Sequence, residues 1–265
     1  MNIKQIGRKI QHRLPPLFHP RRVRIVLSDG KAFVLTDPFS LSISTALAFH
    51  QDLSYEEETL FFFKKALSGS SVFFDIGANM GIYTLVALLY HPKIRVYSFE
   101  PVPQVFKILR NNVLANHGEI RVRCEEAALT DFVGTVNLYV NGDCEASTLL
   151  GFRSEVIPIQ VRSMSLDAYC SEHQIDFIDI LKVDTEGTEP TVLRGGREII
   201  KRSKPIIFCE VLRGRTEAAL EEFLFPLGYH YFHITEKGLV PKEHIEGDET
   251  YRYLNYMFAV ETPRG

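Results

Sequence analysis

The segment Val72–Gly81 constrains this chain more than any other, because an apolar strand runs directly into a glycine loop and then into a helix. The run Val72–Ile76 is typical of a strand covered on both faces, and Ile82–Leu89 continues as a buried helix. Gly77 and Gly81 let a ligand approach the backbone closely, and free N–H groups at the helix start point at that ligand. The pattern predicts an α/β fold with a nucleotide-type cofactor above this strand.

The loop and the next strand together indicate which cofactor is bound. A dinucleotide fingerprint has the pattern G-x-G-x-x-G, whereas this chain has Asn79 at the second glycine position and Ile82 at the third. The strand predicted at 94–99 ends in Glu100, about 20 residues past the loop, where a carboxylate accepts the hydroxyls of an unphosphorylated ribose. The set resembles the S-adenosylmethionine site of class I methyltransferases: Asp75, Gly77, Asn79, Gly81 and Glu100.

Each of these residues also has a purely structural explanation. Gly77 and Gly81 can be turn and close-packing glycines, and Glu100 before Pro101 can favour the start of a helix. The combined spacing favours the ligand. Two alternatives stay open: an oxidoreductase that binds an NAD-type nucleotide, and a cofactor-binding module without catalytic activity.

Composition limits the class of protein and its partners. The chain has 265 residues, 45% of them hydrophobic, which is enough for a full core. Its net charge of −3 gives no basic field for phosphates, so we predict no nucleic-acid partner. The four cysteines form no C-x-x-C pair and are expected to be reduced thiols, and neither a zinc site nor a disulfide framework is predicted. Nothing in the sequence indicates a particular oligomeric state.

No apolar stretch approaches the roughly 18 residues of a membrane span, and no signal-peptide core follows the N-terminal charges, so we predict a cytoplasmic protein. The basic first 24 residues contain Ile3, Ile6 and Ile10 at helical spacing. A short cap helix that packs these isoleucines on the domain is favoured over contact with an anionic membrane, since Pro15 and Pro16 end the helix. No stable membrane insertion is predicted.

Periodicity predicts an N-terminal extension at residues 1–54 and one α/β domain at residues 55–265. A hairpin signal around Asp29-Gly30 marks the extension. The domain alternates helices and strands, interrupted by an antiparallel pair with an acceptor lid expected near 141–150. The predicted helices are 55–67, 104–115, 166–173 and one between the strands 178–183 and 205–210. The other later strands are 120–124, 135–140, 156–161, 229–233 and 253–260.

A second group of candidate residues lies where the strand 178–183 ends. Asp184, Glu186 and Glu189 follow that strand, and Glu210 ends the next one at the same edge, where open α/β sheets bind ligands. Clustered carboxylates suit acid/base work or a hard cation, whereas the structural alternative is that they complement a helix N-terminus. A Mg²⁺ ion could be coordinated by the carboxylates of Asp184, Glu186 and Glu210. Carboxylate spacing alone does not define a coordination site, however, and no metal is predicted.

At this point the chain resembles the FkbM-type methyltransferases, class I enzymes that use S-adenosylmethionine and mostly methylate hydroxyl oxygens. The resemblance spans most of the chain. Its most specific part is D-x-E-G-x-E, from Asp184 to Glu189, between a buried strand and a helix. Other matching segments are Phe74–Gly81, Phe99-Glu100-Pro101, Ser165-Leu166-Asp167, Val192–Gly195, and Glu126–Leu129 with Asp131.

The resemblance implies a seven-stranded, mostly parallel Rossmann-like sheet with helices on both faces and an antiparallel last strand. It also implies that Asp75 and the backbone of 77–81 face the methionine part of the cofactor, that Glu100 binds the ribose, and that Glu126 and Ala127 line the adenine pocket. The expected partner is a small-molecule or glycan acceptor with a free hydroxyl.

The expected chemistry assigns the acidic residues their roles. An alcohol is a poor nucleophile until its proton leaves, so a nearby carboxylate helps. Asp184 is the first candidate for orienting the acceptor or accepting its proton, followed by Glu186, Glu189 and Glu210.

Overall fold

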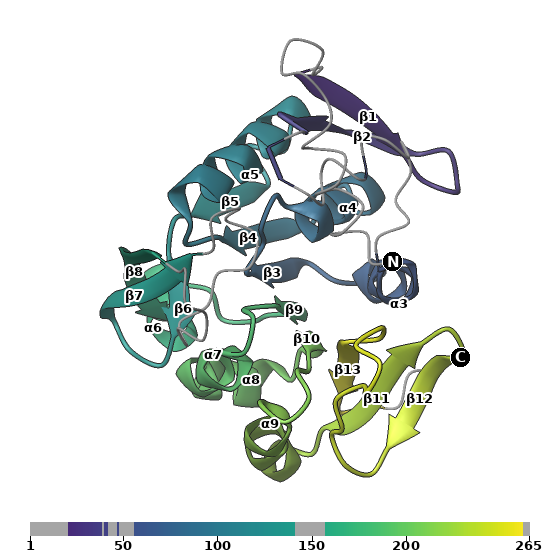
Figure 1. The fold of residues 1–265 in the computed structure, drawn as a ribbon, viewed down its shortest axis with the longest axis vertical. Helices are drawn as coiled ribbons and strands as arrows, with labels where there is room; N and C mark the ends of the chain where they lie inside the picture. The colour runs from purple at the N-terminus through teal and green to yellow at the C-terminus, as the bar shows by residue number, and fades with distance from the viewer. Residues whose placement is uncertain (1–20, 39, 42–46, 48–55, 141–156, 262–265) are drawn as a thin grey trace.

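A central sheet of eight strands runs through the molecule (Figure 1). The computed structural model describes residues 21–38, 40–41, 47, 56–140 and 157–261. Five neighbouring strands, from one edge of the sheet inward, are parallel. In spatial order they are β5 (Val122–Glu125), β4 (Arg95–Phe99), β3 (Val72–Ile76), β9 (Ile180–Val183) and β10 (Ile206–Glu210).

The remaining strands extend the sheet beyond β10. Strand β13 (Asn255–Ala259) runs antiparallel between β10 and β11 (His230–Thr235), which confirms the predicted antiparallel last strand. The seven expected strands are all present. Strand β12 (Gly238–Lys242) adds an eighth at the sheet edge by pairing with β11. This strand was not predicted, because a short segment that contains a proline has little strand character in its sequence, although the edge of a sheet tolerates a proline.

Helices cover both faces of the sheet, as predicted for a class I fold. All five residues of β3 are buried, and successive side chains point to opposite faces, so Phe73 and Phe74 belong to two different cores. One core includes α3 (Glu57–Leu67), α4 (Ile82–Tyr90) and α5 (Pro103–Ala115). The other includes α6 (Leu166–Glu172), α7 (Glu189–Gly195), α8 (Arg197–Ser203) and α9 (Glu217–Leu224), which a short 3-10 turn (Phe225–Leu227) follows.

Two details of the helices bear on the predictions. The single helix expected between the strands 178–183 and 205–210 is divided into α7 and α8 at Gly196. Within the described ranges, none of the helices has the length and apolar character needed to cross a bilayer.

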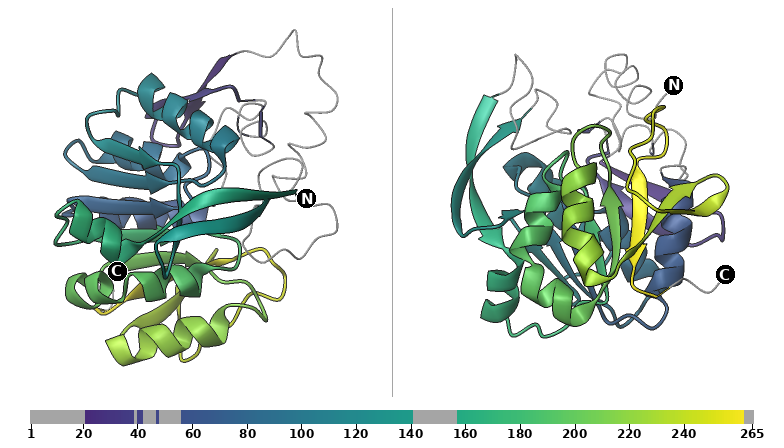
Figure 2. Two further views of the ribbon diagram at one scale, coloured as in Figure 1. Left: turned by 90° about the vertical axis from the view of Figure 1, so that its left-hand side faces the viewer. Right: turned by 90° about the horizontal axis from the view of Figure 1, so that it is seen from below.

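A small second sheet contains β6 (Ala128–Thr130), β8 (Ile157–Ser165) and β7 (Gly134–Val140). Strands β7 and β8 pair antiparallel, as predicted, and form a long hairpin beside the main sheet (Figure 2). Strand β6, which was not predicted, pairs parallel with β8 over three residues. The acceptor lid expected near 141–150 lies outside the described residues.

The N-terminal hairpin packs onto the main domain. Strands β1 (Arg22–Val26) and β2 (Ala32–Thr36) pair antiparallel, which confirms the predicted hairpin. Asn112 on α5 accepts hydrogen bonds from the backbone and side chain of Thr36, and donates one to the carbonyl of Met80. The hairpin is thereby tied to the glycine loop. The basic segment 1–20 and the expected boundary at residue 54 lie outside the described residues.

Candidate active site

The glycine loop lies at the carboxyl end of β3, beside the end of β4. The amides of Gly77 and Ala78 both donate to the carbonyl of Phe99, at 3.0 and 2.9 Å. Gly77, Asn79 and Gly81 have φ angles of 74°, 51° and 89°, and α4 begins directly afterwards at Ile82. Asparagine tolerates the left-handed backbone better than most residues, so Asn79 replaces a glycine without breaking the turn.

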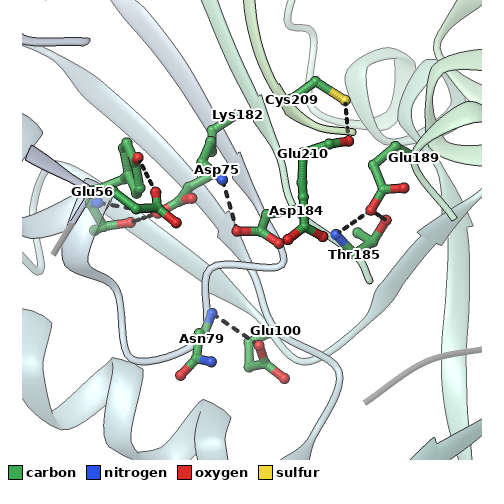
Figure 3. A network of polar contacts seen from close by, with 12 residues as sticks. Glu56, Asp75, Asn79, Glu100, Lys182, Asp184, Thr185, Glu189, Cys209 and Glu210 are labelled. Atoms are coloured by element: carbon green, nitrogen blue, oxygen red, sulfur yellow. Dashed lines mark hydrogen bonds and ion pairs between the residues drawn. The ribbon is translucent and has the colours of Figure 1, made fainter. Parts of the chain in front are cut away.

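Glu100 follows β4 and points toward this loop (Figure 3). Its Oε2 accepts the amide of Asn79 at 3.0 Å, and its Oε1 accepts the amide of Val102 at 2.9 Å. The side chain is 6% exposed, and burial raises its pKa to about 7. Each carboxylate oxygen has a further lone pair, so a fixed pair of acceptors suits the two hydroxyls of a ribose.

Asp75 lies beneath the loop rather than at its surface. Its Oδ2 accepts the amide and the hydroxyl of Thr84 at 3.1 and 2.6 Å, and that hydroxyl also contacts Ser98 at 2.7 Å. The residue is 2% exposed, and burial raises its pKa to about 6. These contacts fix the first turn of α4, which follows the glycine loop directly.

Residues Glu126 and Ala127, which were assigned to the adenine pocket, follow β5. The amide of Glu100 donates to the carbonyl of Glu125 at 3.1 Å, so the ends of β4 and β5 lie together. Glu126 is exposed and Ala127 is buried. A small residue under the end of β5 and a carboxylate at its rim are compatible with a flat ring bound there.

Asp184 begins the loop after β9, and this loop contacts the glycine loop directly. The amide of Asp184 donates to the carbonyl of Ile76 at 3.0 Å. A Cβ on Gly77 would lie 1.9 Å from the carbonyl oxygen of Asp184, so only glycine fits there. The glycine loop and the loop that carries Asp184 therefore pack tightly against each other.

Lys182 holds the Asp184 side chain in place. Its Nζ lies 2.9 Å from Oδ2 of Asp184 and 4.9 Å from the ring centre of Tyr83, whose hydroxyl donates to Glu56 at 2.5 Å (Figure 3). The lysine is 1% exposed. Burial opposes its charge, but the carboxylates of Asp184 and Glu56 outweigh this effect and raise its pKa. Lys182 is therefore a buried cation beside the site.

No role was predicted for Lys182. Its position in an apolar strand could have indicated one, because a buried lysine requires a partner of opposite charge.

The other two acidic residues of the D-x-E-G-x-E loop lie differently. Glu189 is fully buried, and its Oε1 accepts the amide and hydroxyl of Thr185 and the amide of Gly187, at 2.9, 3.1 and 3.0 Å. Burial raises its pKa. Glu186 is half-buried, with a φ of 58°. Through these contacts Glu189 lies beneath the loop and stabilises the backbone that carries Asp184 and Glu186.

Glu210 ends β10 beside this loop. Val183 and Cys209 are opposite each other in the parallel pair of β9 and β10, so Glu210 comes level with Asp184 at the carboxyl edge. Glu210 is 8% exposed. The structure thus brings Asp184 and Glu210 to adjacent strand ends and leaves Glu189 below them. In the part of the chain that the structure describes, no three His, Cys, Asp or Glu side chains gather as a metal site.

The glycine loop and the D-x-E-G-x-E loop meet between β3 and β9, where the order of the strands in the sheet reverses. From β3 the chain proceeds to β4 and β5 on one side, whereas β9 and β10 lie on the other. Open α/β sheets bind ligands in the crevice at such a switch point. The Glu100 carboxylate and the glycine backbone lie on one side of this switch point, and Asp184 and Glu210 lie on the other.

The chain matches one family model, described as the methyltransferase FkbM domain, over residues 75–233. That range covers the glycine loop, Glu100, the D-x-E-G-x-E loop and Glu210.

Two curated relatives match about half of the chain. The 2-O-methyltransferase NoeI of Sinorhizobium fredii is 31% identical over 150 residues, and the match covers 50% of this chain and 60% of the relative. The 31-O-demethyl-FK506 methyltransferase FkbM of Streptomyces tacrolimicus is 30% identical over 139 residues, covering 51% of this chain and 52% of the relative. The match thus spans between half and two thirds of the length of these relatives.

A solved structure of a methyltransferase FkbM from Methylobacillus flagellatus has the same fold. It is 18% identical in sequence, with a TM-score of 0.50, and the match covers 85% of this chain and 56% of that chain.

Proposed function

Because this chain belongs to the FkbM methyltransferase family, we propose that it transfers a methyl group from S-adenosylmethionine to a hydroxyl oxygen of a sugar or secondary metabolite. The observation that carries the proposal is the carboxylate of Glu100, fixed by two backbone amides next to the glycine loop at the switch point of the sheet. Two relatives named as O-methyltransferases support oxygen as the acceptor atom.

The proposed cofactor residues lie on one side of the site. Glu100 would bind the ribose, the backbone of 77–81 would face the methionine part, and Glu126 with Ala127 would line the adenine pocket. Bound S-adenosylmethionine supplies a methyl group that is activated by the positive charge on sulfur. The protein's own task is then to hold the acceptor oxygen in line with that methyl group and to exclude water.

The proposed acceptor residues lie on the other side. Asp184 would orient the acceptor hydroxyl and take its proton. Its ion pair with Lys182 fixes the side chain in position before the acceptor arrives. Glu210 at the adjacent strand end and Glu186 in the same loop would complete the polar surface around the hydroxyl, while Glu189 braces the loop from below.

We also propose a cytoplasmic location and a division into an extension at 1–54 and a catalytic domain at 55–265. Cys124, Cys170 and Cys209 are free thiols, which suits a reducing compartment.

Calorimetric titration with S-adenosylmethionine and with its demethylated product tests the cofactor, with NAD as the control. We expect saturable binding of both sulfur compounds and none of NAD. Glu100→Ala should weaken their binding at least about 100-fold, because two hydrogen bonds to a charged group are lost at about 1.5–3 kcal/mol each.

Asp179→Ala is the matched control for Glu100→Ala. The Asp179 carboxylate also accepts two backbone amides, from Ser71 and Val72 at 2.7 and 2.9 Å, but it lies at the opposite end of the strands. We expect it to lower thermal stability without changing cofactor affinity. Binding of NAD by the unaltered protein, or an unchanged affinity in Glu100→Ala, would contradict the proposal.

Cofactor affinity should fall as the pH is lowered through 7. Burial raises the pKa of Glu100 to about 7 in the free protein, and ribose hydroxyls bind the ionised carboxylate better than the protonated acid. The affinity at pH 6 should be about tenfold lower than at pH 8, since one pH unit below the pKa leaves about a tenth of the groups ionised. Titrations at several pH values measure this slope, which Glu100→Gln should abolish. A flat profile in the unaltered protein would show that Glu100 does not bind the ribose.

A further inference from the structure

Asn255 lies at the same edge of the sheet as the proposed acceptor residues. It is the first residue of β13 and is directly opposite Glu210, the last residue of β10, in the antiparallel pair. Directly opposite residues point to the same face, with Cβ atoms about 4.5–5.5 Å apart. The strand ends of β9, β10 and β13 therefore place Asp184, Glu210 and Asn255 in one row.

The side chain of Asn255 is buried but lacks a hydrogen-bond partner for its oxygen. It is 6% exposed, and among the described residues no group donates to its Oδ1. A buried amide oxygen without a partner is unfavourable, and such groups in native proteins call for an explanation.

The rest of β13 gives the asparagine no structural role. The other four residues of the strand are buried and apolar or aromatic. A leucine would continue this pattern and fill similar space. The chain instead has a carboxamide beside a carboxylate, in a segment that lies beyond the family match at 75–233.

We propose that Glu210 and Asn255 bind two neighbouring hydroxyls of the methyl acceptor, which is therefore a polyol such as a sugar ring rather than a molecule with one isolated hydroxyl. The carboxylate accepts a hydrogen bond from one hydroxyl, and the carboxamide can donate to and accept from the next. The hydroxyl to be methylated then lies on the Asp184 side of this pair. This inference rests on the proposed methyltransferase function.

Asn255→Leu separates a binding role from a structural one. The thermal midpoint of the variant should equal or exceed that of the unaltered protein, because a buried polar group without a partner is replaced by an apolar group of similar size. Its affinity for the demethylated cofactor should be unchanged.

Acceptor binding is measured on protein saturated with the demethylated cofactor, by saturation-transfer NMR with a panel of methyl hexopyranosides and with cyclohexanol. We expect at least one pyranoside to bind to the unaltered protein. Its affinity should fall at least tenfold in Asn255→Leu, and cyclohexanol should bind to neither protein.

Tyr231→Phe is the matched control variant. The hydroxyl of Tyr231 is also buried without a partner in the described structure. Its ring, however, packs against Phe258 in the core that includes α6 to α9. This change should leave pyranoside binding unaltered.

Three results would overturn the inference. They are a thermal midpoint of Asn255→Leu several degrees below that of the unaltered protein, equal pyranoside binding in both proteins, and cyclohexanol binding as well as the pyranosides. If the unaltered protein binds the demethylated cofactor but no pyranoside, the sugar acceptor is wrong and the methyltransferase stands. If it binds no cofactor, the proposed function itself fails.

Discussion

Asp184→Asn is expected to lower the rate of methyl transfer by about 100- to 10,000-fold, the usual contribution of a general base, while cofactor affinity stays within about threefold. The asparagine keeps the size of the side chain but cannot take a proton from the acceptor. It also lacks the charge that pairs with Lys182 at 2.9 Å, so some loss of thermal stability should accompany the loss of turnover.

The measurement is transfer of labelled methyl from S-adenosylmethionine to whichever pyranoside of the panel accepts it. Calorimetry of the same sample shows whether the cofactor site is intact. Glu186→Gln is the comparison, because Glu186 lies two residues away in the same loop and is half-buried. We expect it to retain more activity. Full turnover by Asp184→Asn would move the role of base to another residue.

Gly77→Ala should destabilise the protein by about 4 kcal/mol or more and abolish cofactor binding, an exceptionally large effect for one methyl group. The added Cβ would lie 1.9 Å from the carbonyl oxygen of Asp184, so the two loops would have to separate. The φ of 74° at this position adds strain for any residue with a side chain.

Gly228→Ala distinguishes the clash from the strain. Gly228 has a φ of 77°, but an added Cβ would meet nothing within 4 Å. Only the strain, about 1–2 kcal/mol, should appear there. Urea unfolding of the three proteins measures both effects. Equal losses in the two variants would show that the loops can move apart and that the contact between them is not rigid.

Much of the fold could be predicted from apolar periodicity and from glycine positions. The run Val72–Ile76 is uniformly apolar except for Asp75, and the structure buries all five residues between two layers of helices. The hairpin at Asp29-Gly30 and the antiparallel pair of β7 and β8 also follow from local patterns. The order of the elements along the chain and the type of sheet were therefore within reach of the sequence.

The arrangement of side chains within the D-x-E-G-x-E loop could not be predicted from the sequence. The spacing of D-x-E-G-x-E places Asp184, Glu186 and Glu189 in one short segment, but it does not show which way each side chain points. That depends on the left-handed backbone at Glu186 and Gly187, with φ of 58° and 111°, which turns the loop so that Glu189 lies beneath it. The position of Asn255 opposite Glu210 depends likewise on the pairing of β10 with β13, which no local pattern specifies.

Because of the strand order, the residues proposed for the cofactor and those proposed for the acceptor come from two separate parts of the sequence. Groups proposed for the cofactor come from residues 77–127, and those proposed for the acceptor come from 184–255, on the other side of the switch between β3 and β9. If the proposed function holds, mutation and recombination in the second part would alter which hydroxyl compound is methylated without disturbing the binding of the methyl donor. The contact of Gly77 with Asp184 sets the limit, since any exchanged segment must preserve the backbone at that junction.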